Sequence, residues 1–176
     1  IGHTAVLTMN NPPANTWTAE SLALLKQKVI ELNANKEIYA LVLTGEGEKF
    51  FSAGADLKLF ADGDKGNAAT MAKHFGEAFE ALSAFRGVSI AAINGYAMGG
   101  GLEVAIRCHS IVALRQATLQ FPEITLGILP GIGGCVVPYR RWPRGAALYH
   151  DMICFGKPIK AKEAAEIGMV AELADN

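Results

Sequence analysis

Two acidic residues in the second half of the chain have the surroundings that acid/base chemistry requires. Glu103 comes directly after the glycine run at positions 99–101, in the first turn of an expected helix. Glu123 follows Pro122 and precedes mostly apolar sequence, where burial would raise its pKa. Two acids in different environments can divide the roles of general base and general acid. Each acid also has a simpler explanation, because acids are common at helix N-termini and in surface turns.

The three consecutive glycines would let a ligand approach the backbone closely. A missing Cβ removes the steric barrier, and free amides at the start of a helix donate hydrogen bonds. The second small-residue loop, at residues 52–56, would also direct amides outward. Tight packing between a strand and a helix explains a glycine run equally well. The combination of two acids and two amide-rich loops favours a site for an oxyanion or a phosphate.

The elements that must position these residues alternate between strands and helices. The turn at residues 95–101 connects a strand to the helix that carries Glu103, and a polar loop is expected at residues 62–67. This order predicts an α/β fold with right-handed crossovers. The expected strands are residues 4–9, 40–44, 89–94, 110–114 and 118–121, and the expected helices are residues 18–35 (N-cap Thr18), 68–85, 102–108 and 162–168.

Composition indicates one soluble domain. The chain has 176 residues, 51% of them hydrophobic, and a formal net charge of −1. Such a balance leaves no basic face for nucleic acid or an anionic membrane. No run of about 18 apolar residues predicts a membrane span, and the first residues do not resemble a signal peptide. The start without Met suggests that the chain begins inside a longer gene product.

Cysteines and basic residues suggest little specialised chemistry. Three cysteines without a CxxC pair favour a reducing compartment over a disulfide framework or a zinc site.

The densest basic stretch is formed by Arg140, Arg141 and Arg144 around Trp142. We interpret it as solvated surface, with a role near an anionic ligand as the alternative.

Three motifs, in this order, resemble the crotonase (enoyl-CoA hydratase/isomerase) superfamily. They are FSAGAD at residues 51–56, INGYAMGGGLE at 93–103 and FPEITLGILPGIGG at 121–134. KPIKAKEAAEIGMV at 157–170 is similar to the region that precedes the family's C-terminal helices. The resemblance implies a ββα spiral with two roughly perpendicular sheets flanked by helices. It also implies a single core domain over residues 1–176 that lacks the extreme N-terminus and the C-terminal helices.

The resemblance implies a role for each matched residue. The backbone amides of Ala55 and Gly100 would form an oxyanion hole for the thioester oxygen. Glu103 would orient and deprotonate the water that attacks C3, and Glu123 would supply the proton at C2. The pocket for coenzyme A would be formed by Pro13, Ala14, Ala53, Ala55, Asp56, Leu57, Lys58 and Gly100.

The implied activity is that of an enoyl-CoA hydratase, which adds water across the 2,3 double bond of a 2-enoyl-CoA thioester. It needs no metal, nicotinamide or flavin, because coenzyme A is part of the substrate. The resemblance also implies a homotrimer or hexamer in the cytoplasm or an organelle matrix. Cys135-Val136-Val137-Pro138, in place of a Thr-Gln-Arg-Leu-like segment, and Cys108-His109, in place of Cys-Asp, depart from the family pattern and leave the acyl group open. We interpret His109 as an ordinary boundary residue.

Several alternatives remain at this point. A Δ3,Δ2-enoyl-CoA isomerase needs mainly one base, and the presence of Glu103 argues against it. Related enzymes perform decarboxylation, dehalogenation, ring cleavage or ring closure with different acids. A serine hydrolase is disfavoured because the sequence has no GxSxG motif and no histidine beside a nucleophile motif. A non-catalytic acyl-CoA-binding subunit is the alternative outside enzymes.

Overall fold

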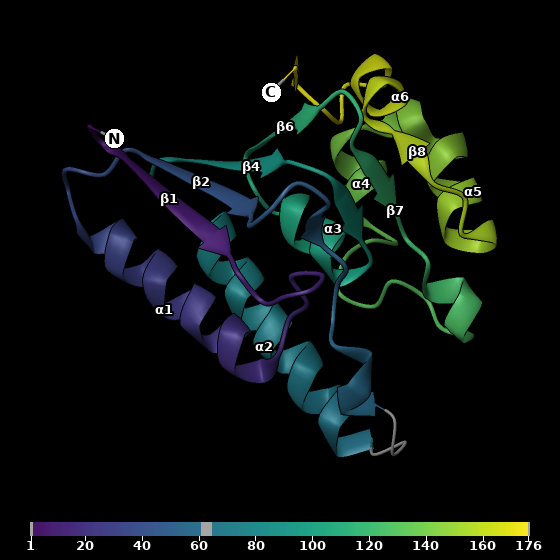
Figure 1. Ribbon diagram of the computed structural model, residues 1–176, viewed down its shortest axis with the longest axis horizontal. Helices are drawn as coiled ribbons and strands as arrows, with labels where there is room; N and C mark the ends of the chain where they lie inside the picture. The colour runs from purple at the N-terminus through teal and green to yellow at the C-terminus, as the bar shows by residue number, and fades with distance from the viewer. Residues whose placement is uncertain (1, 61–64, 176) are drawn as a thin grey trace.

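A computed structural model describes residues 2–60 and 65–175, and its elements form two sheets flanked by helices (Figure 1). The α/β prediction is confirmed. Along the chain the elements are β1 (Thr4–Met9), α1 (Ala19–Ala34), β2 (Ala40–Gly45), β3 (Phe50–Ser52), η1 (Leu57–Phe60), α2 (Lys65–Ser83), β4 (Val88–Ile93), β5 (Tyr96–Met98), α3 (Gly100–Ala105), β6 (Ser110–Leu114), β7 (Thr118–Gln120), η2 (Glu123–Leu126), α4 (Val137–Arg141), η3 (Pro143–Gly145), α5 (Ala146–Phe155), β8 (Ile159–Lys160), α6 (Ala161–Glu166) and β9 (Glu172–Ala174).

The larger sheet has the strand order β1-β2-β4-β6-β9, and all its pairs are parallel. Parallel neighbours need crossover connections, which α1, α2 and α3 supply. Helices α1 and α2 lie side by side along one side of this sheet, whereas α4, α5 and α6 gather beyond its other end (Figure 1). The alternating burial of β2 and β4 places Leu41, Leu43, Ala91 and Ile93 in the core.

The smaller sheet has the order β3-β5-β7-β8 and brings the predicted site segments together. β3 leads into the loop that contains Ala55, β5 leads into α3, and β7 leads into η2 with Glu123. Because β3, β5 and β7 are parallel, their carboxyl ends meet at one edge. The sheet thus delivers the amide loops and both acids to the same place.

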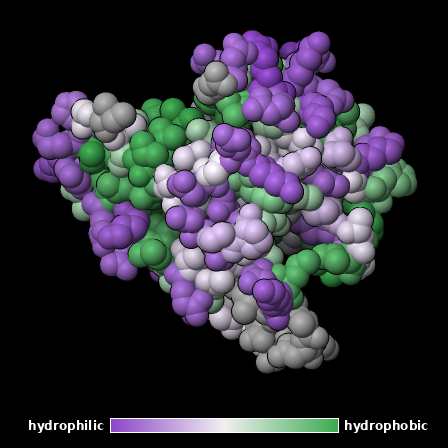
Figure 2. All heavy atoms as spheres, in the orientation of Figure 1, coloured by the Kyte–Doolittle hydropathy of each residue, from purple (hydrophilic) through white to green (hydrophobic). Residues whose placement is uncertain are grey.

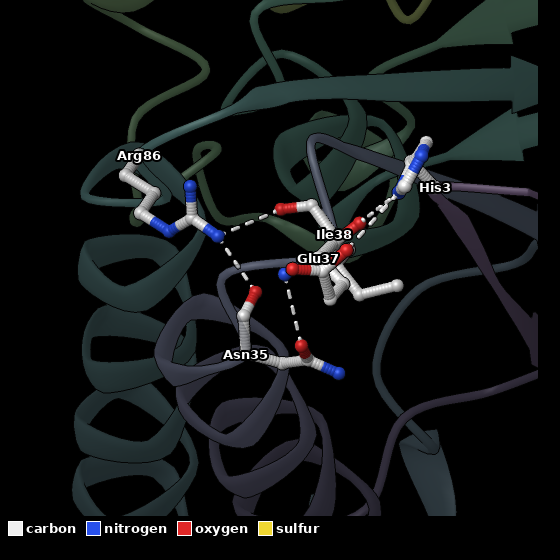
Figure 3. Close-up of polar contacts among 5 residues, drawn as sticks. All are labelled: His3, Asn35, Glu37, Ile38 and Arg86. Atoms are coloured by element: carbon white, nitrogen blue, oxygen red, sulfur yellow. Dashed lines mark hydrogen bonds and ion pairs between the residues drawn. The ribbon is translucent and has the colours of Figure 1, made fainter.

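Helix α1 is held at both ends by polar contacts. Thr18 and Ser21 form a reciprocal capping box at its N-terminus, which confirms the predicted cap. At its C-terminus, Arg86 reaches from the connection between α2 and β4 and donates from Nη2 to the carbonyl oxygens of Asn35 (2.6 Å) and Ile38 (3.0 Å), as Figure 3 shows. The Arg86 charge lies next to the negative end of the helix dipole, where it is favourable.

Some sequence predictions of element bounds were wrong. The turn predicted at residues 95–101 contains strand β5, because Tyr96–Met98 pairs with two segments that are distant in sequence. Helix α3 begins at Gly100 rather than at Leu102. Helix α2 begins at Lys65 rather than at Ala68, since extending an established helix by a few residues costs little. Residues 62–64 of the predicted loop lie outside the described residues.

The basic stretch lies at the surface, as predicted, because Arg140, Arg141 and Arg144 are all exposed. The Arg141 guanidinium also donates hydrogen bonds to the carbonyl oxygens of Ile106, Cys108 and His109, just after α3. Elements α4, α5, β8 and β9 lie where the sequence suggested no structure. Within the described ranges, none of the helices is both long enough and apolar enough to cross a membrane.

Candidate active site

The amide of Ala55 points away from its neighbouring strand. Trp17 forms an isolated parallel bridge with Ala55, in which Trp17 N donates to Gly54 O and Asp56 N donates to Trp17 O, both at distances near 2.9 Å. In a parallel bridge these two bonds use the groups on either side of the bridged residue, so that residue's own N–H faces the opposite way. The Ala55 N–H is therefore directed away from Trp17.

Glycine is required where the loop after β3 meets α3. A methyl group placed on Gly54 would lie 3.0 Å from Gly100 N and 2.9 Å from Met98 O, and the φ of Gly54 is +92°. A methyl group on Gly100 would lie 3.6 Å from Ala55 N and 2.8 Å from the Phe75 ring. The loop that carries Ala55 and the start of α3 thus share one small space, and glycine is what allows them to approach so closely.

Glu103 is held by the loop that follows η2. Its Oε1 accepts hydrogen bonds from the backbone amides of Ile132 and Gly134, each at 2.9 Å. Glu103 is 2% exposed, and burial raises the pKa of its carboxyl group, while the two amides and the charge of Arg107 oppose that rise. Two amide donors stabilise the ionised form, which is the form that accepts a proton.

Glu123 has a different environment. It is the first residue of η2 and is 9% exposed, and its buried Oε2 has no hydrogen-bond partner among the residues that the structure describes. Burial raises its pKa to about 7, and the negative charge of Glu103 adds to the rise. A methyl group on Gly99 would lie 3.0 Å from Glu123 Oε1, so the glycine run leaves room for this carboxyl group. Glu123 therefore holds a proton over a pH range in which most carboxyl groups have lost theirs.

The structure brings together the segments predicted to bind coenzyme A. Ala53 N donates to Ala14 O at 2.9 Å, so the loop at residues 53–58 lies against the segment that contains Pro13 and Ala14. Asp56 turns this loop by accepting from Lys58 N at 3.0 Å, and Leu57 and Lys58 are exposed. The loop therefore presents its backbone and the Leu57 and Lys58 side chains to solvent.

Three contributors to the site were missed in the sequence. The Ile132 and Gly134 amides bind Glu103, Phe75 of α2 packs at Gly100, and Cys135 follows the Gly134 amide directly. Burial raises the pKa of the Cys135 thiol, and the charges of Glu103 and Glu123 raise it further. Only the GIGG segment gave a signal, because consecutive glycines near an acid suggest backbone donors.

The raised pKa of Glu123 predicts a measurable dependence of stability on pH. Its pKa is about 7 in the folded protein against 4.5 for the free group, so the folded state binds more protons between these values. Stability from this group is complete below pH 4.5 and falls as the pH rises toward 7. Glutamine does not ionise, so the Glu123→Gln variant should not lose this stability as the pH rises. We expect its free energy of unfolding, relative to that of the wild type, to increase by roughly 2–3 kcal/mol between pH 5 and pH 8.

Urea unfolding at several pH values measures this difference. Glu80→Gln, which replaces an exposed carboxylate of α2, is the matched control and should follow the wild type. Parallel stability curves for wild type and Glu123→Gln would contradict the buried, proton-holding state of Glu123.

Comparison with known proteins agrees with this arrangement. The family model described as enoyl-CoA hydratase/isomerase matches residues 2–175. A probable enoyl-CoA hydratase of Bacillus subtilis is 40% identical over 171 residues, which cover 95% of this chain and 64% of the relative. The 2,3-dehydroadipyl-CoA hydratase of Escherichia coli is also 40% identical over 171 residues, with 96% and 64% covered. The chain thus spans about 64% of the length of these curated relatives.

Solved structures show the same fold. The chain matches Pseudomonas aeruginosa DspI with a TM-score of 0.94 and 54% identity, over 99% of this chain and 71% of that one. It matches an enoyl-CoA hydratase from Bacillus anthracis with a TM-score of 0.93 and 32% identity, over 99% of this chain and 67% of that one. The predicted resemblance is confirmed, and the chain belongs to the enoyl-CoA hydratase/isomerase (crotonase) family.

Proposed function

We propose that this chain carries the catalytic core of an enoyl-CoA hydratase. Glu103 takes a proton from the water that attacks C3, and Glu123 gives a proton to C2. The amides of Ala55 and Gly100 hydrogen-bond the thioester oxygen as negative charge develops on it. Asp56, Leu57, Lys58 and Ala53, with Pro13 and Ala14 opposite, contact coenzyme A.

The observation that carries this proposal is the inequality of the two acids. Glu103 Oε1 accepts two amide hydrogen bonds, whereas the buried Glu123 Oε2 has no partner within residues 2–60 and 65–175, and the pKa of Glu123 is about 7. Hydration needs one group that accepts a proton and one that donates it, and groups whose pKa values are set by different environments suit these roles. An isomerase that shuttles one proton has no such need for both acids.

The proposal extends to the assembly. We propose self-association as a trimer or a pair of trimers, and a single core domain in this chain. Figure 2 shows apolar side chains gathered over η2 on the face in view, and Leu126, Ile128 and Leu129 are each more than half exposed. Apolar side chains that are exposed so close together favour burial against another protein surface. Sedimentation of the purified protein tests the assembly.

A panel of 2-enoyl-CoA and 3-enoyl-CoA thioesters tests the activity. We expect water addition to the 2-enoyl compounds, seen as loss of the conjugated-thioester absorbance, and slower or no conversion of the 3-enoyl compounds. Preferential conversion of 3-enoyl to 2-enoyl thioesters would favour the isomerase. Binding of acyl-CoA without turnover of either would favour a non-catalytic acyl-CoA-binding subunit.

A further inference from the structure

A hollow of about 780 Å³ lies beside the end of α3, one helical turn after Glu103. Its volume is in the range of small-molecule sites. The described residues that line it include three arginines and a histidine and no acidic residue. The lining comes from Ser83 at the end of α2, from the segment directly after α3, from the loop at residues 131–133 and from both ends of α4, where Arg140 and Arg141 are the last two residues.

Arg107 is held at this hollow by a hydrogen bond and a contact with an aromatic ring. Its Nη2 donates to Ile132 O at 2.9 Å, and its guanidinium lies 5.1 Å from the centre of the Phe79 ring. Gly133 has a φ of +143°, and a methyl group on it would lie 2.5 Å from Nη2, so another residue here would be strained and would make the guanidinium shift. The Arg107 Nε is buried and has no hydrogen-bond partner in the described part of the chain. A guanidinium has five N–H donors, and the bond to Ile132 uses one of them, so with respect to the described residues Arg107 has donors left for a further acceptor.

The other two arginines add positive charge. Arg141 uses its donors on the carbonyl oxygens at the end of α3, whereas Arg140 is exposed and makes no side-chain hydrogen bond to the described residues. Across residues 2–60 and 65–175, no salt bridge neutralises Arg107, Arg140 or Arg141. A concave surface lined by charges of one sign attracts ions of the opposite sign.

We propose that this hollow is a binding site for a small anionic group, with Arg107 and Arg140 as its donors. The group is a phosphate or a carboxylate, because both accept hydrogen bonds from a guanidinium in a fork geometry. It comes either from a free anion or from a carboxylate at the far end of an acyl chain. Ile132 links the hollow to the candidate active site, since its carbonyl accepts from Arg107 and its amide donates to Glu103.

Binding of inorganic phosphate and of glutarate, measured by calorimetry at constant ionic strength, tests the site. We expect saturable binding of at least one of them, weakened about tenfold by Arg140→Gln, the loss of one charge-assisted contact. Arg144→Gln is the matched control, because Arg144 is exposed, carries the same charge and does not line the hollow. It should change the affinity less than about twofold, within the range of long-range charge effects.

Arg140 is the primary variant because Arg107 also supports the loop and its replacement risks misfolding. Absence of saturable binding by the wild type, or equal weakening by Arg140→Gln and Arg144→Gln, would overturn the site. This readout does not depend on catalysis. A protein that hydrates enoyl-CoA but binds neither anion loses only this inference, and one that binds an anion but performs no hydration loses only the proposed function.

The source of the anion is decided with two substrates of equal chain length, one ending in a methyl group and one in a carboxylate. If the substrate supplies the anion, Arg140→Gln raises KM about tenfold for the carboxylate-ended thioester and leaves KM for the other unchanged. Equal effects on both substrates, together with phosphate binding, assign the site to a free anion.

Discussion

Glu103→Gln is expected to lower kcat for water addition by about 10²- to 10⁴-fold, the usual contribution of a positioned general base. A glutamine amide cannot take the proton from water, but its oxygen can still accept from the Ile132 and Gly134 amides. The loop should therefore remain in place. Exchange of the C2 proton of a saturated acyl-CoA, which the proposal assigns to Glu123, should be partly retained.

Stopped-flow absorbance gives the hydration rate, and deuterium incorporation followed by mass spectrometry gives the exchange rate. Acyl-CoA affinity should change much less than turnover, because the Ala55 and Gly100 amides are untouched. Near-normal hydration by Glu103→Gln would refute the paired-acid mechanism. A single-base isomerase that uses Glu123 would then be the better interpretation.

Glu123→Gln is expected to lose both hydration and C2 exchange, again by about 10²- to 10⁴-fold in kcat. The wild-type rate should fall as the pH rises through about 7, because Glu123 then loses the proton that it must donate. The residual activity of the variant should lack this decline. The rise at low pH should remain, since it reflects ionisation of Glu103.

The pH dependence of kcat in wild type and variant measures this difference. Glu80→Gln serves again as the control and should keep the decline at high pH. If Glu123→Gln retained that decline, the group responsible would be another one, and the assignment of Glu123 as the proton donor would fail.

The sequence alone determined the fold class and the family, and it predicted part of the candidate site. Regular alternation of apolar segments predicted β1, α1, β2 and β6 within a residue or two, because local periodicity records which face is buried. The motifs around Ala55, Gly100, Glu103 and Glu123 could be recognised in the sequence. Backbone amides that face a ligand need glycine or other small residues beside them, and such residues are visible in a sequence. The catalytic roles of these residues remain predictions.

Only the tertiary structure decided how the two acids differ. Glu103 and Glu123 are separated by 20 positions in sequence, and nothing local shows that the amides of Ile132 and Gly134 reach the first acid and not the second. Burial depends on every segment packed around a group, so the pKa of Glu123 could not be derived from its neighbours in sequence. Strand β5 and the arginine-lined hollow escaped prediction for the same reason, because both are made by contacts between segments that are distant along the chain.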